Sequence, residues 1–532
     1  MSGSVTVPGS GGGSVVISLN SADTKTLAQQ IADKLNASQA AGTLQTDETT
    51  PVSVTNTDGQ FILLSPTDTG KTIDASSYGY KYVSDQVGGN TLFIGPDASL
   101  IAGGSLGDTI FGGGGDTISA GGGNNVIVES SLSGAIYNIV AGTGNDQINA
   151  SGSGTVAAGT GVNTIYVSGP GTANIVSTGQ DVIGANAATV NASVAGSNTV
   201  LFGDFNAGDP QNTVNVTITG VDDTVSAGYS SLAITTESGE RSGLIFGGFG
   251  PLSVSDSGAN DTISAGSSQA DVSLQGSNAL VFGDSGTGNA ALNVTDNGSN
   301  DTISAVNSDA TVTQGPLSSN LLVFGGSGGL TFVGQGSGSA TVIGGSGGIT
   351  SVTGGAGRLL FFSGSTDATV DGGSGGSTLF GASGQVLTYT NTQGGNAVYQ
   401  ALGGNESINA SGSGGNDTFW ASTTGNDSIL GGSGNDTLFA GTGSDTLGAS
   451  PGGNDQFWFL KQFTTGQNDV ITGFTSNYTI NLSGYNPSYT ESYLINNATT
   501  SSGNTTITLS DNTKVTFLGV ADANTLRGHL NT

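Results

Sequence analysis

The sequence contains no cysteine, one histidine and only nine lysine and arginine residues among 532. Without cysteine, a disulfide framework and thiolate chemistry are excluded. Nine cationic side chains are too few to follow a phosphate backbone, so nucleic acids and anionic membrane surfaces are poor partners. No segment approaches the roughly 18 apolar residues of a membrane-spanning helix. Residues 1–13 show neither a basic start nor an apolar run, so no cleavable signal peptide is visible.

Large apolar and charged side chains are also scarce. The hydrophobic fraction is 34% and the charged fraction 9%, against about 45–50% and about 25% in ordinary globular chains. Such a chain cannot fill a thick core, yet its low charge and ten prolines do not suit a disordered polyelectrolyte either. What is abundant is glycine, with 94 residues, and negative charge, with a formal net charge of −30. This composition favours a thin, repetitive, glycine-punctuated β structure whose natural partners are cations.

Residues 1–98 differ in sequence pattern from the rest of the chain, and they predict a small α+β module. Leu27, Ile31 and Leu35 recur every four residues, which indicates an amphipathic helix over Ala22–Ala40 with Ser21 as its N-cap and Gly42 at its end. Four alternating segments flank it and predict strands: Val15–Leu19, Val52–Thr55, Phe61–Leu64 and Tyr78–Val83.

Residues 99–455 form a string of short apolar segments separated by glycine, serine, asparagine and aspartate. One clear run of such segments starts at residues 330, 340, 349, 359, 368 and 377, a step of nine or ten. Five-residue strands at this step predict a parallel β-solenoid with two strands in each flattened coil. A larger unit of two coils is indicated by Asp223, Asp261 and Asp301, which each begin an Asp-Thr-Val/Ile-Ser segment and stand 38 and 40 residues apart.

The most specific motif lies within residues 414–455. Asp427, Asp436 and Asp445 are spaced by nine residues inside TGNDSIL, GGSGNDTLF and AGTGSDTLG, and Asp417 and Asp455 continue the series at a spacing of ten. This run resembles the hemolysin-type nonapeptide repeat of RTX proteins, with the pattern GGxGxDxUx in which U is a large apolar residue. Partial copies occur at Asp146 and Asp108. The resemblance implies a β-roll whose glycine turns supply backbone carbonyls and whose aspartates supply carboxylates to Ca²⁺.

Calcium is the cofactor that this resemblance implies, and the oxygen-only donor set suits it chemically. Asp427 and Asp445 would then lie on one side of the roll, and Asp417, Asp436 and Asp455 on the other. The alternative is that these aspartates only form Asx turns beside glycine. Between about 156 and 400 the acids come singly, so we expect most coils to be held by strand stacking and polar ladders without metal. The candidate metal ligands are Asp417, Gly425, Asp427, Gly432, Gly434, Asp436, Gly441, Gly443, Asp445, Asp455, Asp146 and Asp108.

Residues 456–532 predict a C-terminal β cap on the solenoid. Strand-like segments at 468–474, 479–484, 506–511 and 515–520 are similar to the C-terminal region of type I secreted RTX proteins, where an uncleaved export signal resides. Asn481 stands where that region has an acid, which departs from the pattern.

No catalytic constellation emerges from the sequence. The pattern GxSxG at Gly325–Gly329 is expected by chance in glycine-serine turns. His529 is the only histidine and stands near a terminus that we expect to be frayed, so neither a triad nor a zinc site can be assembled. Trp420 and Trp458 follow equivalent Asn-Asp-x-Phe segments and are predicted to face outward, where they could form a sugar platform or pack beneath a neighbouring domain.

The sequence therefore predicts an all-β protein, a parallel β-solenoid with a small N-terminal α+β module and a C-terminal β cap. We expect no enzymatic activity, and neither a catalytic residue nor an organic cofactor is predicted. The composition is also similar to that of bacterial surface-layer proteins. The expected function is that of a secreted subunit of a calcium-assisted assembly, a surface layer or filament at a bacterial surface, with further copies of itself as partner. The alternatives are an adhesin that binds cell-surface polysaccharide and an exported enzyme without a recognisable site.

Overall fold

The computed structural model describes two short segments, six positions between 29 and 41, and residues 61–532 with a few internal gaps. The two segments are β1 (Gly3–Pro8) and β2 (Ser14–Leu19), which pair antiparallel. The six positions, 29, 33, 36, 37, 40 and 41, are helical, while the rest of the predicted helix and Val52–Thr55 lie outside the described residues. The gaps after residue 61 are 65–66, 77–79, 86, 97–99, 131–133, 207–211, 287, 384 and 465.

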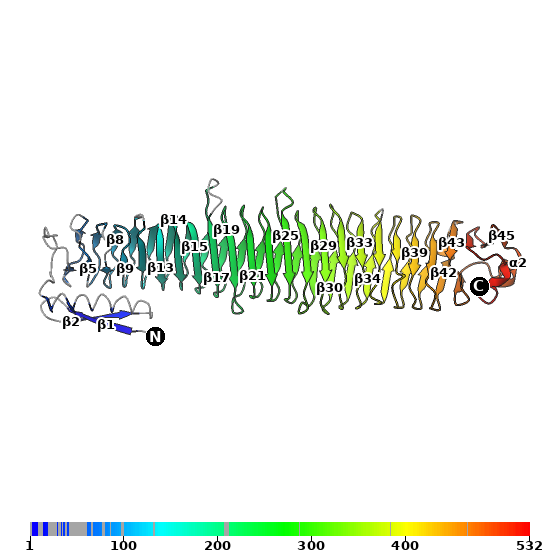
Figure 1. Ribbon diagram of the computed structural model, residues 1–532, viewed down its shortest axis with the longest axis horizontal. Coiled ribbons are helices and arrows are strands. Elements are labelled where there is room, and N and C mark those ends of the chain that lie inside the picture. The colour runs from blue at the N-terminus through cyan, green and yellow to red at the C-terminus, as the bar shows by residue number, and fades with distance from the viewer. Residues whose placement is uncertain are drawn as a thin grey trace. The chain divides into compact units, whose positions relative to one another are not determined.

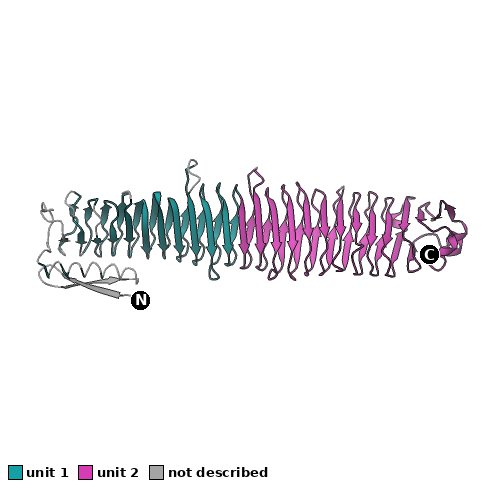
Figure 2. Ribbon diagram, viewed as in Figure 1, with its two compact units in different colours: residues 1–268 teal, residues 269–532 magenta. Residues whose placement is uncertain are grey.

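The chain divides into two compact units, residues 1–268 and 269–532 (Figure 2). Each unit is a parallel β-solenoid in which strands alternate along the chain between two sheets, so that each strand pairs with the strand two positions away (Figure 1). This confirms the predicted all-β, two-strand coil. Parallel pairing follows from the repeat, because every coil brings the same short apolar segment back in the same direction.

In unit 1, the strands β14 (Thr164–Ser177) and β15 (Val182–Val194) are long enough to belong to both sheets. The first sheet otherwise contains β3 (Phe61–Leu64), β5 (Tyr82–Asp85), β7 (Leu100–Ala102), β9 (Thr117–Ser119), β11 (Ile136–Val140), β13 (Ser153–Gly159), β17 (Thr213–Ile218), β19 (Ser231–Thr236) and β21 (Leu252–Asp256). The second contains β4 (Thr72–Asp74), β6 (Thr91–Phe93), β8 (Thr109–Gly112), β10 (Val126–Glu129), β12 (Gln147–Ser151), β16 (Val200–Phe202), β18 (Thr224–Ser226), β20 (Leu244–Phe246) and β22 (Thr262–Ser264).

The solenoid of unit 1 begins before residue 99, the start that the sequence predicts. β3 pairs parallel with β5, and β5 with β7, in the same ladder that continues to β9. Phe61–Leu64, and Tyr82 and Val83 of the predicted strand Tyr78–Val83, therefore contribute to the solenoid rather than to an α+β module, while residues 78 and 79 lie outside the described residues. Their turns carry less glycine than the later ones, so composition alone did not reveal the coils.

In unit 2, the first sheet contains β23 (Ala270–Leu274), β25 (Ala291–Asp296), β27 (Asp309–Gln314), β29 (Leu330–Gly334), β31 (Thr350–Thr353), β33 (Ala368–Asp371), β35 (Leu387–Thr390), β37 (Ser407–Asn409), β39 (Ser428–Gly431), β41 (Thr446–Ala449) and β43 (Asn468–Thr472). The second contains β24 (Leu280–Phe282), β26 (Thr302–Ser304), β28 (Leu321–Phe324), β30 (Ala340–Ile343), β32 (Leu359–Phe362), β34 (Ser377–Phe380), β36 (Ala397–Gln400), β38 (Thr418–Trp420), β40 (Thr437–Phe439), β42 (Gln456–Leu460) and β44 (Thr479–Ser483).

The core is built from columns of stacked apolar residues, with one or more buried side chains from most strands. In unit 1, Ile110, Ile127, Ile148 and Ile165 are aligned on successive coils and are at most 2% exposed. Burying each such side chain contributes about 1.5–3 kcal/mol. In most short strands the next residue on either side faces outward, which gives an alternating burial. A thin core of this kind explains how the fold forms with so few large apolar residues.

The last coils of unit 2 end in a cap with its own small core. A hairpin of β46 (Asn504–Thr508) and β47 (Lys514–Phe517) is antiparallel, with β45 (Thr499–Ser501) at its edge, while β47 also pairs parallel with β43. The cap also contains η2 (Lys461–Phe463), α2 (Glu491–Asn496), η3 (Ala523–Leu526) and β48 (Leu530–Asn531), which pairs with β44. Leu494, Ile507 and Phe517 are buried in it, so the end of the ladder is covered.

Candidate metal centre

Two rows of stacked acidic residues lie where the turns of unit 2 lead into its strands. The acids of row 1 stand at the start of strands of the first sheet, and the acids of row 2 at the start of strands of the second. In both rows the backbone N–H of one acid donates to the carboxylate of the acid on the next coil, at 2.9 Å from Asp427 to Asp445 and at 2.9 Å from Asp436 to Asp455. Row 1 consists of Glu406, Asp427, Asp445 and Asp469, and row 2 of Asp417, Asp436 and Asp455.

The acids are held in these rows by the residue two positions further on. Asp436 is followed by Thr437, which faces outward, and by Leu438, which is fully buried. The same acid-x-apolar step links Asp427 to Ile429 and Asp455 to Phe457. Because the apolar residue must enter the column, the acid is fixed at the last turn position, where it faces the acid of the neighbouring coil.

Most of these carboxylates have one oxygen that is buried and without a hydrogen-bond partner. In row 2 this is Oδ2 of Asp417, Asp436 and Asp455. In row 1 it is Oδ2 of Asp469 and both oxygens of Glu406. Oδ2 of Asp427 and Asp445 instead accepts a backbone N–H, from Ser422 at 2.6 Å and from Gly441 at 2.8 Å. A buried oxygen without a partner is costly, so these positions favour a bound cation.

Burial raises the pKa of several acids in both rows. It raises the pKa of Asp417 to about 7 and that of Asp445 to about 6. Burial, with the charge of Asp445 adding to it, raises the pKa of Asp469 to about 8. The pKa of Glu406 rises to about 9, first through burial and then through its contact with Asp427. Both rows therefore hold carboxyl groups that are unfavourable as bare anions and that a divalent cation would neutralise.

The glycines of the motif bring backbone carbonyls close to the rows. A Cβ atom at Gly434 would overlap the carbonyl oxygen of Gly415, and one at Gly443 that of Gly425. Gly425 also has a φ of +111°, which other residues rarely adopt. Gly432 and Gly441 lie in the same way over the carbonyls of Ser413 and Ser422. Each turn thus combines carboxylate and carbonyl oxygens with no nitrogen or sulfur donor, which is the ligand chemistry of Ca²⁺.

Comparison with known proteins agrees with this chemistry. Residues 411–447 match the family model of the RTX calcium-binding nonapeptide repeat, in four copies. These turns are RTX repeats. RTX nonapeptide repeats bind calcium ions and are typical of secreted extracellular proteins. Neither the curated proteins nor the solved structures include a match to the chain.

The RTX match does not extend to Asp108 and Asp146 in unit 1. These two acids lie in one row, row 3, but Asn125 stands between them: Asp108 N–H donates to Asn125 Oδ1 at 2.9 Å, and Asn125 N–H to Asp146 Oδ1 at 2.7 Å. Asn163 separates Asp146 from Asp181 in the same way. The amide accepts the same backbone bond as a carboxylate and adds no charge. Row 3 is therefore a polar ladder in which aspartate and asparagine alternate, and the binding of calcium at Asp108 and Asp146 stays a prediction.

Glu406 and Asp469 belong to row 1 and were not predicted as ligands. Both show the acid-x-apolar step, in Glu406-Ser-Ile408 and in Asp469-Val-Ile471. Glu406 replaces the aspartate of the repeat, and Asp469 follows an insertion that breaks the spacing of nine. Only the registers of β37 with β39 and of β41 with β43 place them in the row.

Three further expectations bear on function. Trp420 and Trp458 face outward from one sheet, two coils apart. Phe439 lies on the coil between them, with its ring centroid 3.6 Å from that of Trp420. His529 is not frayed: its Nδ1–H donates a hydrogen bond to the Tyr478 carbonyl oxygen at 2.9 Å, and its ring packs edge-on against Phe474. Within the described part of the chain, no helix combines the length and apolarity that crossing a membrane requires.

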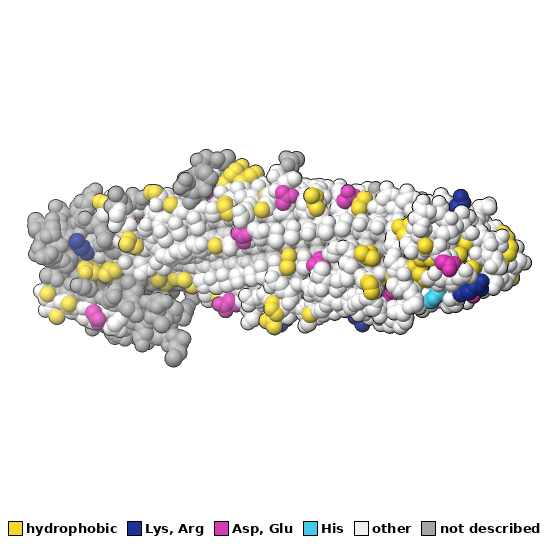
Figure 3. All heavy atoms as spheres, turned by 45° about the vertical axis from the view of Figure 1, so that its right-hand side comes forward, with side chains coloured by type: hydrophobic (Ala, Val, Ile, Leu, Met, Phe, Trp, Pro, Cys, Tyr) yellow, Lys and Arg dark blue, Asp and Glu magenta, His cyan; other side chains and the backbone are white. Residues whose placement is uncertain are grey.

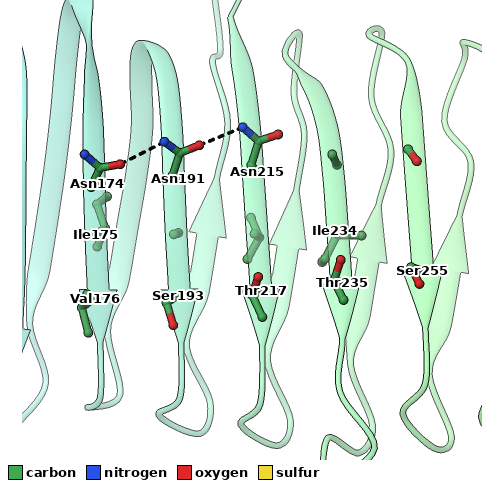
Figure 4. A pocket seen from close by; sticks show the side chains of 14 residues that line it. Asn174, Ile175, Val176, Asn191, Ser193, Asn215, Thr217, Ile234, Thr235 and Ser255 are labelled. Carbon is green, nitrogen blue, oxygen red and sulfur yellow. Dashed lines mark hydrogen bonds between the residues drawn. The ribbon is translucent and has the colours of Figure 1, made fainter.

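An open groove in unit 1 is lined by outward polar side chains of the first sheet. Asn174, Asn191 and Asn215 lie on successive strands, and each amide donates to the one before it, at 2.9 and 2.8 Å (Figure 4). Because its amides bond to one another, this ladder stabilises the sheet and presents no titratable group for catalysis.

Proposed function

We propose that this protein is a secreted structural subunit of an extracellular assembly, a surface layer or a filament, and that calcium controls its folding. The observation that carries the proposal is the pair of rows in unit 2, where acids stack directly on acids and bury oxygens without partners. Such rows oppose folding unless cations or protons neutralise them.

Calcium supplies the neutralising charge when it is bound. At low calcium the acids of rows 1 and 2 repel one another, which favours an unfolded chain during export. In the roughly millimolar calcium outside a cell, binding releases the repulsion and the binding free energy becomes folding free energy. The single histidine and the absence of cysteine support a non-catalytic role.

The outward faces support an assembly of copies rather than a small-molecule site. On the face that Figure 3 shows, neutral polar side chains and backbone cover most of the described surface, and charged groups are scattered. The aromatic stack at Trp420, Phe439 and Trp458 covers the inner ring faces, which a sugar would need for stacking. This arrangement favours packing against protein over the polysaccharide-binding alternative.

Negative-stain electron microscopy of the purified chain, with calcium and then with a chelator, tests the proposal. We expect ordered sheets or filaments in calcium that dissolve on chelation. The substitutions Asp427→Asn, Asp436→Asn and Asp445→Asn, made together, keep the Oδ1 acceptors but remove three charges. We expect this variant to remain folded in chelator.

A matched control replaces three exposed aspartates of the same unit, Asp271, Asp309 and Asp367, with asparagine. It changes the net charge equally and should behave as the wild type. Dispersed particles of the wild type in calcium would refute the assembly. Assemblies that survive chelation unchanged would refute control by calcium.

A further inference from the structure

A cluster of three acids outside rows 1, 2 and 3 lies in unit 1, far along the sequence from the RTX match. Glu240, Asp256 and Asp261 each offer a carboxylate oxygen, and these oxygens lie within 4.8 Å of one another. All three side chains are at most 1% exposed. In the sequence Asp261 stands as an isolated acid, because Glu240 and Asp256 belong to no nonapeptide repeat and only the coil brings the three together.

Glu240 occupies a position that is glycine in the adjoining coils. The bridges from Val221 to Arg241 and from Arg241 to Ala259 align Glu240 with Gly220 before it and with Gly258 after it. A Cβ atom at Gly258 would overlap Glu240 Oε2 and Asp261 Oδ2. The glycine thus leaves room for a carboxylate from the preceding coil, and that carboxylate points into the turn formed by Asp256 and Asp261.

Both oxygens of Glu240 are buried without a hydrogen-bond partner, as are Oδ2 of Asp256 and of Asp261. The other oxygens are satisfied: Asp256 Oδ1 accepts from Thr236 Oγ1 at 2.5 Å and Gly258 N at 2.9 Å, and Asp261 Oδ1 accepts from Gly243 N at 2.7 Å. The protein therefore fixes the outer oxygens of the two aspartates and leaves the inner ones facing Glu240 with no donor. Burial, with the neighbouring acids adding to it, raises the pKa of Glu240 to about 9.

A related turn in unit 2 lacks this feature. Asp296 and Asp301 repeat the spacing of Asp256 and Asp261 and stand 40 residues later. The bridge from Ser277 to Ser299 places Gly276, not an acid, in the coil before Gly298. In addition, the Ser318 hydroxyl donates to Asp296 Oδ2. In this turn, which has no counterpart of Glu240, the Ser318 hydroxyl supplies the proton that Asp296 Oδ2 accepts.

We propose that Glu240, Asp256 and Asp261 form a separate calcium site that clamps two consecutive coils of unit 1. Oxygen ligands of one Ca²⁺ lie about 2.3–2.6 Å from the ion and hence up to roughly 5 Å from one another, which the spacing of these carboxylates matches. The donor set is entirely oxygen, which selects calcium over transition metals. The site does not depend on the RTX turns: its ligands come from a different unit and include a glutamate at a glycine position.

The test counts calcium ions bound to the full chain by native mass spectrometry at buffered free calcium. Glu240→Gln keeps the size of the side chain and removes its charge, and we expect it to bind one ion fewer than the wild type. Glu237→Gln changes an exposed acid of the same turn and should bind the wild-type number. An unchanged ion count in Glu240→Gln would overturn the proposal and leave a cluster that shares protons instead.

Two further measurements separate this site from the RTX turns and from misfolding. The variant Glu240→Gly places at this position the glycine that the adjoining coils have. We expect this variant to fold and to bind one ion fewer than the wild type. In crystals of the wild type soaked with Tb³⁺, we expect an anomalous peak between Glu240, Asp256 and Asp261. Peaks at residues 411–447 without one at Glu240 would refute the site while leaving the proposed function intact.

Discussion

At the scale of single residues, aspartate and asparagine occupy the same ladder position with different consequences. Asn125 and Asp436 each accept a backbone N–H of the preceding coil through Oδ1. The amide can also donate, and Asn125 Nδ2 bonds to Asp146 Oδ1 at 2.8 Å. Asp436 has no such donor, and its Oδ2 remains buried without a partner. An amide nitrogen in place of a carboxylate oxygen therefore removes one charge from the row and adds one hydrogen-bond donor.

This difference predicts the effect of Asp436→Asn. In chelator the free energy of unfolding should be unchanged or higher, because a buried charge is removed while the Oδ1 acceptor is kept. The stabilisation by calcium should fall by about 2.7 kcal/mol at calcium 100-fold above the dissociation constant, the value of one lost site. Urea unfolding followed by the fluorescence of Trp420 and Trp458, which lie on coils next to Asp436, measures both quantities.

The control for this measurement is Asp367→Asn, which alters an exposed aspartate of the same unit. It should leave both free energies within about 0.5 kcal/mol of the wild type. A loss of stability in chelator on Asp436→Asn, with the calcium response intact, would contradict a role of Asp436 in ion binding.

At the scale of elements, the coil and the partners within the nonapeptide run could be predicted from the sequence, but the partners of turns outside that run could not. The step of nine or ten from residue 330 predicted the strands that are observed as β29 to β34, because glycine and apolar residues mark a turn and a strand locally. The neighbours of Glu240 lie 16 and 21 residues away, and Asp469 follows a longer turn than its predecessors. Contacts of this kind depend on the register between coils, which no local pattern encodes.

The rows also predict how pH acts on the calcium-free turns. Burial raises the pKa of Asp417 to about 7, of Asp445 to about 6 and of Asp469 to about 8, whereas an unfolded aspartate titrates near 3.9. At a pH between the unfolded pKa and the raised pKa values, the folded chain binds more protons than the unfolded chain. Its free energy of unfolding therefore decreases as pH rises through this range. We therefore expect the melting temperature in chelator to be highest near pH 4 and to fall towards pH 8.

Saturating calcium should remove most of this fall in melting temperature with pH, because the bound ion neutralises the carboxylates in place of protons. Calorimetry at pH 5, 6, 7 and 8, with and without calcium, provides the comparison. The variant with asparagine at 427, 436 and 445 serves as the control and should show a smaller pH dependence in chelator. A melting temperature that rises with pH in chelator would mean that these acids are stabilised as anions, contrary to their burial.

At the scale of the whole molecule, the acids are distributed unequally between the two units. Rows 1 and 2 in unit 2 stack acid on acid, whereas row 3 in unit 1 alternates Asp108, Asn125, Asp146 and Asn163. In a solenoid each coil contacts only its neighbours, so stability is close to a sum of local terms. Loss of calcium should therefore unfold the coils that stack acids and spare those that alternate.

Hydrogen exchange with mass spectrometry on the full chain, before and after chelation, tests this division. We expect peptides within 406–469 to lose protection, because their buried carboxylates then face one another without a cation. Peptides within 108–183 should keep theirs, because every second position supplies an amide instead of a charge. If both sets lost protection together, the asparagines of row 3 would not substitute for calcium, and the coils of unit 1 would depend on ions as those of unit 2 do. If neither set changed, strand stacking and the apolar column alone would hold the RTX coils, and calcium could not control their folding.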